Sequence, residues 1–191
     1  MLDREKTILA INNIMEKNEI KIQELPFLNK INLRLNPNNN QHMSICENIL
    51  ETILPIQSNT YSQNKKVKSI WLSPDEWLVV YDDDDDDIFI NLKDKLGDIE
   101  ASVTDISENR TVIRISGKNI FILLSKFLVL DLEKNLSTQT SCVQTLFVKV
   151  PVLLLRNNKD NQTPEVDIFV NKSHANYIYN LIIDGTKNLD F

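Results

Sequence analysis

Residues 70–80 constrain the fold of this chain most, because they hold both of its tryptophans, Trp71 and Trp77, in one short stretch. Two runs of β-favouring apolar residues flank the Ser-Pro-Asp-Glu sequence at 73–76, which predicts two antiparallel strands joined by a tight turn. The indole is a large apolar group with one hydrogen-bond donor. We therefore expect both tryptophans to anchor the core or an interface.

Glycine is scarce, and its distribution excludes one large class of cofactor site. The 191 residues contain three glycines, Gly97, Gly117 and Gly185, which are isolated from one another. A dinucleotide fingerprint or a phosphate-binding loop needs several glycines close together, so that the backbone can approach the phosphates. We therefore expect no nucleotide or flavin site of the Rossmann kind in this chain.

The balance of charge argues against a nucleic-acid partner. With 21 Lys and Arg against 27 Asp and Glu, the formal net charge is −6. Phosphate backbones are bound by clustered positive charge, whereas the densest basic group here is only Lys65, Lys66 and Lys68. The longest apolar runs, at 120–124 and 150–155, fall far short of the ~20 residues that cross a bilayer, so we expect no membrane partner.

Cysteine usage and the amino-terminal residues indicate the compartment. Cys46 and Cys142 are far apart and belong to no paired motif, and residues 1–17 are charged without the apolar stretch of a signal peptide. We therefore expect a cytoplasmic protein. His42 and Cys46 lie one helical turn apart, which leaves two interpretations open: a surface histidine above a core cysteine, or a metal or redox pair.

Hydrophobic periodicity and breaker residues predict the order of the elements. The predicted helices are residues 1–17, a stretch with Cys46, Ile49, Leu50 and Ile53, a stretch with Ile88 to Leu96 that follows the aspartates 82–87 and stops at Gly97, a stretch after Gly117, and a last helix. The last helix is predicted to be capped by Ser173, to bury Ala175, Ile178, Tyr179 and Ile182, and to end at Gly185. The predicted extended segments are 19–35 with a bend at 25–27, the tryptophan hairpin, 101–106 paired with 110–116, 141–155 with a bend or edge at Pro151, and 166–170. Residues 36–41 are predicted to form a turn that can also cap the following helix, and residues 57–66 are predicted to be a polar loop.

These elements predict an α+β protein made of two packed halves, each combining a β-sheet with helices. We expect an amino-terminal helix or extension at 1–18, a first lobe at 19–99 and a second lobe at 100–191, which together form one compact unit. A chain of this length buries roughly 70% of the surface that its unfolded form exposes, so its core needs no disulfide.

Few residues combine into a pattern that carries chemistry. Asp75 and Glu76 are adjacent carboxylates, but neighbouring residues in a strand or turn point apart, which disfavours an acid–base pair. The aspartates at 82–87 lack the glycine turn of a Ca²⁺ loop and favour a helix amino terminus instead. Ser173 and His174 show no nucleophile elbow and no acid partner, which disfavours a hydrolase triad.

Four further polar residues have positions that predict structural roles. Asp105 and Arg110 lie across a short turn and are expected to pair and to fix it. Asp131 and Gln144 stand beside apolar runs, where we expect them to cap a helix end or to bridge strands. No catalytic, cofactor-binding or metal-ligating residue emerges from these patterns.

Several segments stand in a definite order along the chain: ELPFLNKINLR at 24–34, WLSPDEWL at 71–78, VTDISENRTVIRISG at 103–117, LVLDL at 128–132, SCVQTLFVKVPVLLL at 141–155, DIFV at 167–170 and SHANYIY at 173–179. Taken in this order, they resemble one known family, the gamma subunit of heterotetrameric sarcosine oxidase. The resemblance covers about residues 20–184, and its specificity comes from the order and spacing of the whole set. The chain departs from the family pattern at Ser73 and Phe127, where glycine is common.

The resemblance implies a non-catalytic subunit of an amine-oxidising complex. In that family the complex oxidises sarcosine to glycine, reduces oxygen to hydrogen peroxide, and releases the methyl group as formaldehyde or methylenetetrahydrofolate. Flavins, NAD and folate are expected in the partner subunits and none in this chain. The gamma subunit resembles the folate-binding lobes of the aminomethyltransferase fold without its extra barrel domain. The resemblance further implies contact with the alpha subunit, a role in assembly or stability, and no activity for the isolated chain.

Two other functions remain as hypotheses. One is a stand-alone folate-binding or aminomethyltransferase-like protein, although 191 residues are too few for the further barrel domain of that fold. The other is a structural module for an unrelated partner. Folate binding by the isolated chain favours the first hypothesis, whereas co-purification with the large subunits favours the accessory-subunit interpretation.

Overall fold

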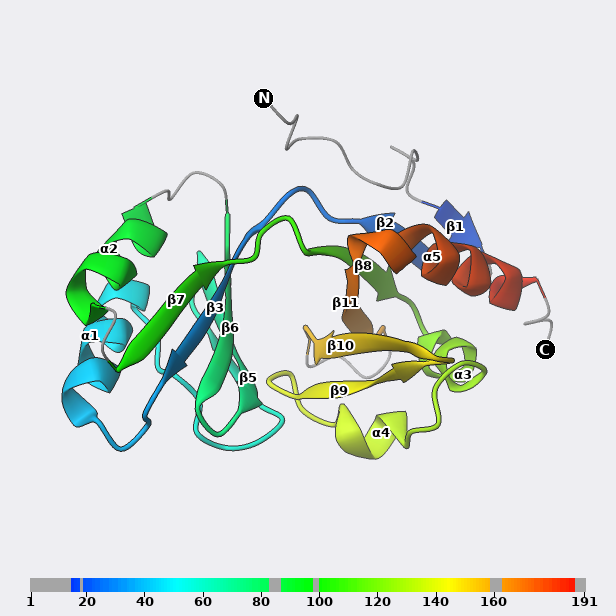
Figure 1. Cartoon of the computed structure of the whole chain (residues 1–191). Helices are drawn as coiled ribbons and strands as arrows, with labels where there is room; N and C mark the ends of the chain where they lie inside the picture. Colours follow the sequence, from blue (N-terminus) through cyan, green and yellow to red (C-terminus); the bar gives the residue numbers. More distant parts are fainter. Residues whose placement is uncertain (1–14, 18, 83–86, 98–99, 159–162, 188–191) are drawn as a thin grey trace, which may run out of the picture. The chain divides into compact units, whose positions relative to one another are not determined.

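The computed structural model describes residues 15–17, 19–82, 87–97, 100–158 and 163–187 (Figure 1). The chain divides into two compact units: unit 1 comprises Met1–Pro26 and Asn109–Phe191, and unit 2 comprises Phe27–Glu108. Each unit combines one antiparallel sheet with helices. The α+β class predicted from the sequence is therefore confirmed.

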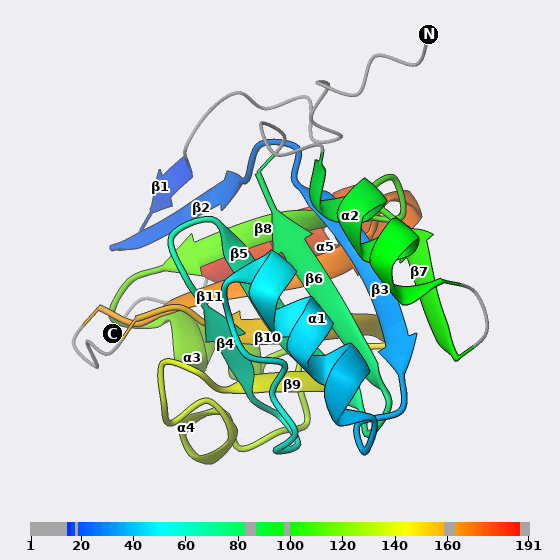
Figure 2. The same ribbon diagram turned by 90° about the vertical axis from the view of Figure 1, so that its left-hand side faces the viewer.

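Unit 2 is a five-stranded sheet in the order β4-β5-β6-β3-β7, with two helices. Its elements are β3 (Asn29–Leu35), α1 (Asn40–Leu50), β4 (Tyr61–Gln63), β5 (Val67–Ser73), β6 (Glu76–Tyr81), α2 (Asp87–Leu96) and β7 (Ala101–Asp105). Figure 2 shows α1 crossing the face of the central strands. Because successive side chains of a strand point to opposite faces, alternate residues such as Ile31, Leu33, Trp77 and Val79 form the core together with Cys46, Leu50 and Leu92 of the helices.

The ends of α1 follow from local capping chemistry. The side-chain oxygen of Asn39 accepts a hydrogen bond from the backbone N–H of His42 at 3.1 Å, which confirms the cap predicted within 36–41. The helix ends at Leu50, because Glu51 adopts a left-handed conformation with φ 51°. Ile53, expected on the buried face of this helix, follows its end and is 62% exposed.

Helix α2 begins at the last residue of the acidic run. Asp87 is its first residue, as expected for acidic side chains near a helix amino terminus, while residues 83–86 lie outside the described residues. Gly97 ends the helix with φ 67°, and its N–H donates to the carbonyl of Lys93 at 3.1 Å. The stop predicted at Gly97 is confirmed.

Unit 1 is a six-stranded sheet in the order β1-β2-β8-β11-β10-β9, with three helices. Its elements are β1 (Met15–Lys17), β2 (Ile20–Glu24), β8 (Arg110–Ser116), α3 (Ile120–Ser125), α4 (Leu132–Asn135), β9 (Cys142–Phe147), β10 (Val150–Arg156), β11 (Glu165–Asn171) and α5 (Lys172–Thr186). Helix α5 packs on β8 and β11 and against α3. It buries Ala175, Ile178, Tyr179 and Ile182, the four residues predicted from its periodicity.

The division into units corrects the expected lobes at 19–99 and 100–191. Strand β2 pairs with β8 in unit 1, whereas β7 pairs with β3 in unit 2, so each expected lobe contains a strand of the other sheet. The bend predicted at 25–27 is confirmed, and it is where the chain passes from one sheet to the other. Residues 1–14 of the expected amino-terminal helix lie outside the described residues, and Met15–Lys17 form strand β1 instead.

Two expected strand arrangements are wrong. Residues 101–106 and 110–116 do not pair with each other, because β7 adds to β3 and β8 lies between β2 and β11. The single extended segment expected at 141–155 is a hairpin of β9 and β10 that turns at Val148. Pro151 lies just before Val152, the first β10 residue that pairs with β11, so its missing N–H falls outside that ladder.

Two local expectations also need correction. The loop expected at 57–66 contains the short strand β4, which pairs with β5. The residue that precedes α5 is Asn171 and not Ser173, and the helix continues through Gly185 to Thr186. Gly185 lies where α5 approaches α3, since a Cβ atom there would come within 2.7 Å of Phe127 and 2.8 Å of Leu123. This glycine is needed for close packing rather than for ending the helix.

Candidate functional site

The tryptophan hairpin is a packing element of unit 2. Trp71 and Trp77 are directly opposite each other on β5 and β6, so their side chains share one face of the sheet. Trp77 is fully buried, and its indole N–H donates to the carbonyl of Pro55 at 2.8 Å. Trp71 is half-buried, and its backbone N–H donates to the carbonyl of Thr60 at 3.1 Å. This hydrogen bond from the buried indole holds the segment after α1 against the sheet.

Asp75 holds the turn of this hairpin against the neighbouring strand β3. Its carboxylate accepts a hydrogen bond from the Ser73 hydroxyl at 2.8 Å and lies 3.7 Å from the Arg34 guanidinium. Its backbone carbonyl accepts from the N–H of Leu35 at 3.2 Å. The Ser73 hydrogen bond, helped by the charge of Arg34, lowers the pKa of Asp75 below its ordinary 3.8. A carboxyl held in its ionised form suits a structural contact better than proton transfer near neutral pH.

Glu76 has a different set of partners from its neighbour Asp75. Its carboxylate accepts from the side-chain amide of Asn32 at 2.6 Å and lies 3.9 Å from Arg34. The two adjacent carboxylates therefore share Arg34 but are each held by a separate hydrogen-bond donor. This arrangement ties β6 to β3 and supports the structural interpretation of both residues.

The other four polar candidates fall at different places. Asp131 is the N-cap of α4 and accepts from the backbone N–H of Lys134 at 3.0 Å, one of the two roles expected for it. Asp105 accepts from both the backbone N–H and the hydroxyl of Ser107, at 2.9 and 2.6 Å, which fixes the turn after β7. Arg110 is the first residue of β8 in unit 1. Gln144 is exposed on β9, opposite Leu153.

Sequence reasoning missed the strongest charged contact described in unit 1. Arg114 on β8 and Asp167 on β11 are directly opposite, and the guanidinium holds both carboxylate oxygens at 2.7 and 2.9 Å. Asp167 is almost fully buried, and Glu165 lies 3.4 Å from the same guanidinium. The signal in the sequence is a single charged residue inside each of two apolar strands, which favours a pair because an isolated buried charge is costly.

The thiols and histidines do not form a reactive centre in the described part of the chain. Burial raises the pKa of Cys46 and of Cys142 to about 12, so both thiols stay protonated at physiological pH. His42 is half-buried one turn before Cys46, and His174 accompanies Ser173 in the first turn of α5. Among the residues described, no three His, Cys, Asp or Glu side chains gather as metal ligands. The metal or redox interpretation of His42 and Cys46 has no structural support.

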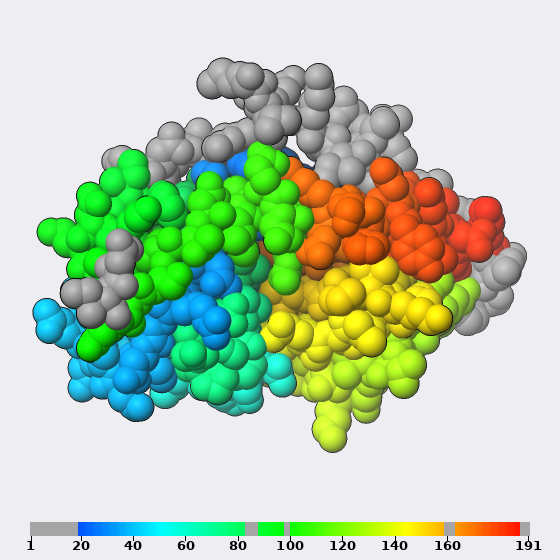
Figure 3. All heavy atoms as spheres, in the orientation of Figure 1, coloured from blue at the N-terminus to red at the C-terminus, as the bar shows by residue number. Residues whose placement is uncertain are grey.

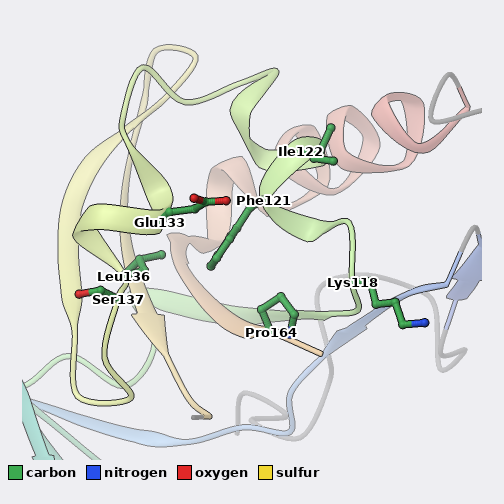
Figure 4. Close-up of a pocket in the computed structure, with 7 residues that line it drawn as sticks. All are labelled: Lys118, Phe121, Ile122, Glu133, Leu136, Ser137 and Pro164. Carbon is green, nitrogen blue, oxygen red and sulfur yellow. The ribbon is translucent and has the colours of Figure 1, made fainter. Parts of the chain in front are cut away.

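Unit 1 contains a pocket of about 420 Å³ between α3 and α4. Figure 4 shows Phe121 and Leu136 directed into the space, with Pro164 opposite and the ammonium of Lys118 directed away. That ammonium lies 3.7 Å from the carboxylate of Glu19. The lining is mixed: Phe121, Ile122, Leu136 and Pro164 are apolar, whereas Lys118, Glu133 and Ser137 are polar, and neither a histidine nor a cysteine is among them.

The sequence predicts no segment that crosses a bilayer, and the helices in the described residues can be compared with that prediction. None of them combines the length with the apolar character that crossing a bilayer requires.

Known proteins share sequence or fold with this chain. The sarcosine oxidase subunit gamma of Corynebacterium sp. (strain P-1) is 26% identical over 143 residues, which cover 74% of this chain and 70% of that protein. The corresponding subunit of an Arthrobacter species shows the same identity and coverage. The alignment with these relatives confirms the resemblance noted in the sequence.

Solved structures show the same fold. A chain of the heterotetrameric sarcosine oxidase from Corynebacterium sp. U-96, in complex with pyrrole 2-carboxylate, superimposes with a TM-score of 0.79 at 22% identity, covering 91% of this chain and 87% of that one. The glycine cleavage system aminomethyltransferase T from Bartonella henselae superimposes with a TM-score of 0.63 at 12% identity, covering 87% of this chain and 46% of that one. The predicted likeness to part of the aminomethyltransferase fold is confirmed at the level of the fold.

The family comparison covers most of the molecule. The model of the sarcosine oxidase, gamma subunit family matches residues 42–188, which include the tryptophan hairpin, the Arg114–Asp167 pair and helix α5. With well over half of its 191 residues matched, this chain belongs to the sarcosine oxidase gamma subunit family.

Proposed function

We propose that this chain is a non-catalytic subunit of a heterotetrameric sarcosine oxidase, where it contacts the alpha subunit and contributes to assembly or stability. The observation that carries the proposal is the family match over residues 42–188. In this proposal the larger subunits oxidise sarcosine to glycine and reduce oxygen to hydrogen peroxide. They hold the flavins, NAD and folate, and this cytoplasmic chain holds none.

The contacts of the polar side chains are consistent with a structural role. Asp75 and Glu76 are held by neighbours on β3 and β5, and Asp131 caps a helix. The two central strands of unit 1 direct Arg114 and Asp167 at each other. Hydrogen-bonded polar groups of this kind fix a fold and its surface, which is what an assembly subunit must offer its partner.

Co-expression tests the proposal directly. A tagged copy of the chain is produced together with the other sarcosine oxidase subunits of its own organism and is then purified by its tag. We expect a yellow complex that releases hydrogen peroxide when sarcosine is added. A colourless tagged chain recovered alone, with an active complex of the other subunits left in the unbound fraction, contradicts the proposal.

The likeness to the aminomethyltransferase defines one rival, a stand-alone folate-binding protein. The chain spans 46% of the Bartonella protein, and at 12% identity the likeness concerns the fold alone. Titration of the purified chain with tetrahydrofolate, followed by the change in tryptophan fluorescence and by calorimetry, separates the two functions. The accessory-subunit proposal predicts no binding below millimolar concentration, whereas submillimolar binding favours the rival.

A further inference from the structure

Four exposed apolar side chains meet at the turn between β9 and β10 in unit 1. Val129 is fully exposed, Leu146 is 55% exposed and Val148 is 45% exposed, and Pro151 is exposed as well. We call these four residues the hairpin-tip surface. Figure 3 shows the yellow residues of this hairpin at the outside of the molecule. Apolar groups gathered on a surface, rather than scattered singly, mark sites of protein interaction.

The strand register shows that these residues are neighbours. Leu146 and Pro151 are directly opposite on β9 and β10, so their side chains lie on one face. On the other side of β9, Leu128 bridges Phe147, and both of these side chains are buried. Because side chains alternate along extended backbone, Val129 and Leu146 point the opposite way, into solvent. Val129, Leu146 and Pro151 therefore form one continuous row.

Val148 breaks two local preferences at once. It adopts φ 60° at the hairpin turn, a conformation that favours glycine and is strained for a β-branched residue. Its side chain is also apolar and exposed, so the folded chain gains little from burying it. Its N–H donates to the carbonyl of Phe127 at 2.9 Å, which any residue type except proline provides equally well. A strained and exposed valine is expected where the side chain becomes buried in a complex.

The charge around the row indicates the chemistry of the partner. Lys149 follows Val148 in the turn and is exposed. Of the charged residues near Val129 in the sequence, Lys126 donates its ammonium to the carbonyl of Gly185 on α5 at 2.9 Å, and Asp131 caps α4 through its carboxylate. In a chain of net charge −6, an apolar row with the cation of Lys149 at its turn complements an apolar segment with carboxylates at its rim.

We propose that the hairpin-tip surface is where a larger subunit of the oxidase docks, through an apolar segment flanked by carboxylates. This inference rests on the proposed function and adds the surface of contact to it. Val148 is the anchor residue of this contact. Its exposed side chain is kept at the turn although the backbone there is strained. Lys149 orients the approaching subunit.

The anchor role predicts effects of opposite sign on stability and on assembly. Val148→Gly relieves the strain, so the isolated chain should melt about 2–4 °C higher. The same substitution removes the buried contact and should reduce incorporation into the complex about tenfold. A merely structural role for Val148 predicts that stability and incorporation change together.

Competition inside one cell measures incorporation without isolating partial complexes. Wild-type and variant chains carrying different tags are co-expressed with the larger subunits, the complex is purified through a larger subunit, and the ratio of the two tags is compared with their ratio in the lysate. Leu146→Gln is a second variant that leaves the turn unchanged and should also fall about tenfold. Lys149→Glu should reduce incorporation most strongly at low salt.

Two substitutions in unit 2 serve as matched controls. Glu51→Gly relieves a left-handed residue of similar φ at the end of α1, and Ile56→Thr removes an equally prominent exposed apolar group, which is 76% exposed. We expect both controls to be incorporated like the wild-type chain. Equal incorporation of Val148→Gly, Leu146→Gln and wild type overturns the docking surface but leaves the proposed function intact. Purification of the larger subunits without any copy of this chain overturns both.

Discussion

Arg114 and Asp167 form a two-pronged ion pair across the central strands of unit 1, with the two N–O distances at 2.7 and 2.9 Å. The pair lies between β8 and β11, the strands on which helix α5 packs. Two parallel hydrogen bonds between planar groups have a fixed geometry in addition to the attraction of opposite charges. They therefore fix the relative position of the two strands. The pair therefore sets the register at the centre of the sheet.

Asp167→Asn should lower the free energy of unfolding by about 2–3 kcal/mol, because Arg114 then loses its ionised partner at a buried position. Replacing both partners, Arg114→Met with Asp167→Leu, should recover most of the loss. Lys118→Gln is the control, since it removes the exposed pair with Glu19 and should cost less than about 0.5 kcal/mol. Urea unfolding measures the free energy of unfolding of the two single variants and of the double variant. Equal losses for Asp167→Asn and Lys118→Gln would contradict the stabilising role of the Arg114–Asp167 pair.

Gly117→Ala should destabilise the chain far more than Gly97→Ala. Gly117 has φ 136°, and a Cβ there would press against the backbone of Glu19 and lie 3.1 Å from the Cα of Ile20. Gly97 has φ 67° with no atom within 4 Å of the added Cβ. We expect a loss of about 2–4 kcal/mol at Gly117 and about 1 kcal/mol at Gly97. Chemical denaturation of the two variants checks this order, and equal losses would contradict the tight approach of the backbone at Gly117.

The two thiols should be unreactive in the folded chain. Burial raises the pKa of Cys46 and Cys142 to about 12, so even at pH 9 the folded protein holds them protonated. The unfolded chain ionises its thiols near pH 9, and stability should therefore fall as the pH rises from about 9 towards 12. Ellman's reagent should react with both thiols in denaturant and with neither at a comparable rate in native buffer. Rapid native labelling of either thiol would contradict the burial.

The carboxyl of Asp75 should titrate below its ordinary 3.8, because Ser73 donates to its ionised form and Arg34 attracts it. A lowered pKa stabilises the folded chain at pH values above 3.8, and this contribution is lost as the pH falls through the folded value. Ser73→Ala should raise the pKa of Asp75, as followed by NMR of its carboxyl carbon. Identical titration curves in the variant and the wild type would show that the hydrogen bond has no such effect.

The sequence predicted elements well where their signals are local. The tryptophan hairpin follows from two apolar runs around a turn, and the buried face of α5 follows from a helical period. The cap at Asn39 and the stop at Gly97 likewise depend on one or two residues. These features need no knowledge of the distant parts of the chain.

The errors concern choices between distant partners. β7 and β8 are separated by four residues, yet β7 pairs with the distant β3 (Asn29–Leu35) and β8 pairs with β2 (Ile20–Glu24) and β11 (Glu165–Asn171). Nothing local in the sequence distinguishes these pairings from a β7–β8 hairpin. The turn at Val148 was missed because it lacks the glycine or asparagine that marks a left-handed residue. The Arg114–Asp167 pair was missed because the two residues meet only once β8 and β11 are aligned.

Reconstitution of the oxidase by subtraction and addition tests the central claim most directly. The larger subunits are produced without this chain, the purified chain is added back, and the species formed are sized by light scattering during gel filtration. The account predicts that the chain enters a stoichiometric complex and raises its yield or its thermal lifetime without itself turning over sarcosine. A fully assembled and equally stable oxidase that never takes up the chain would contradict it.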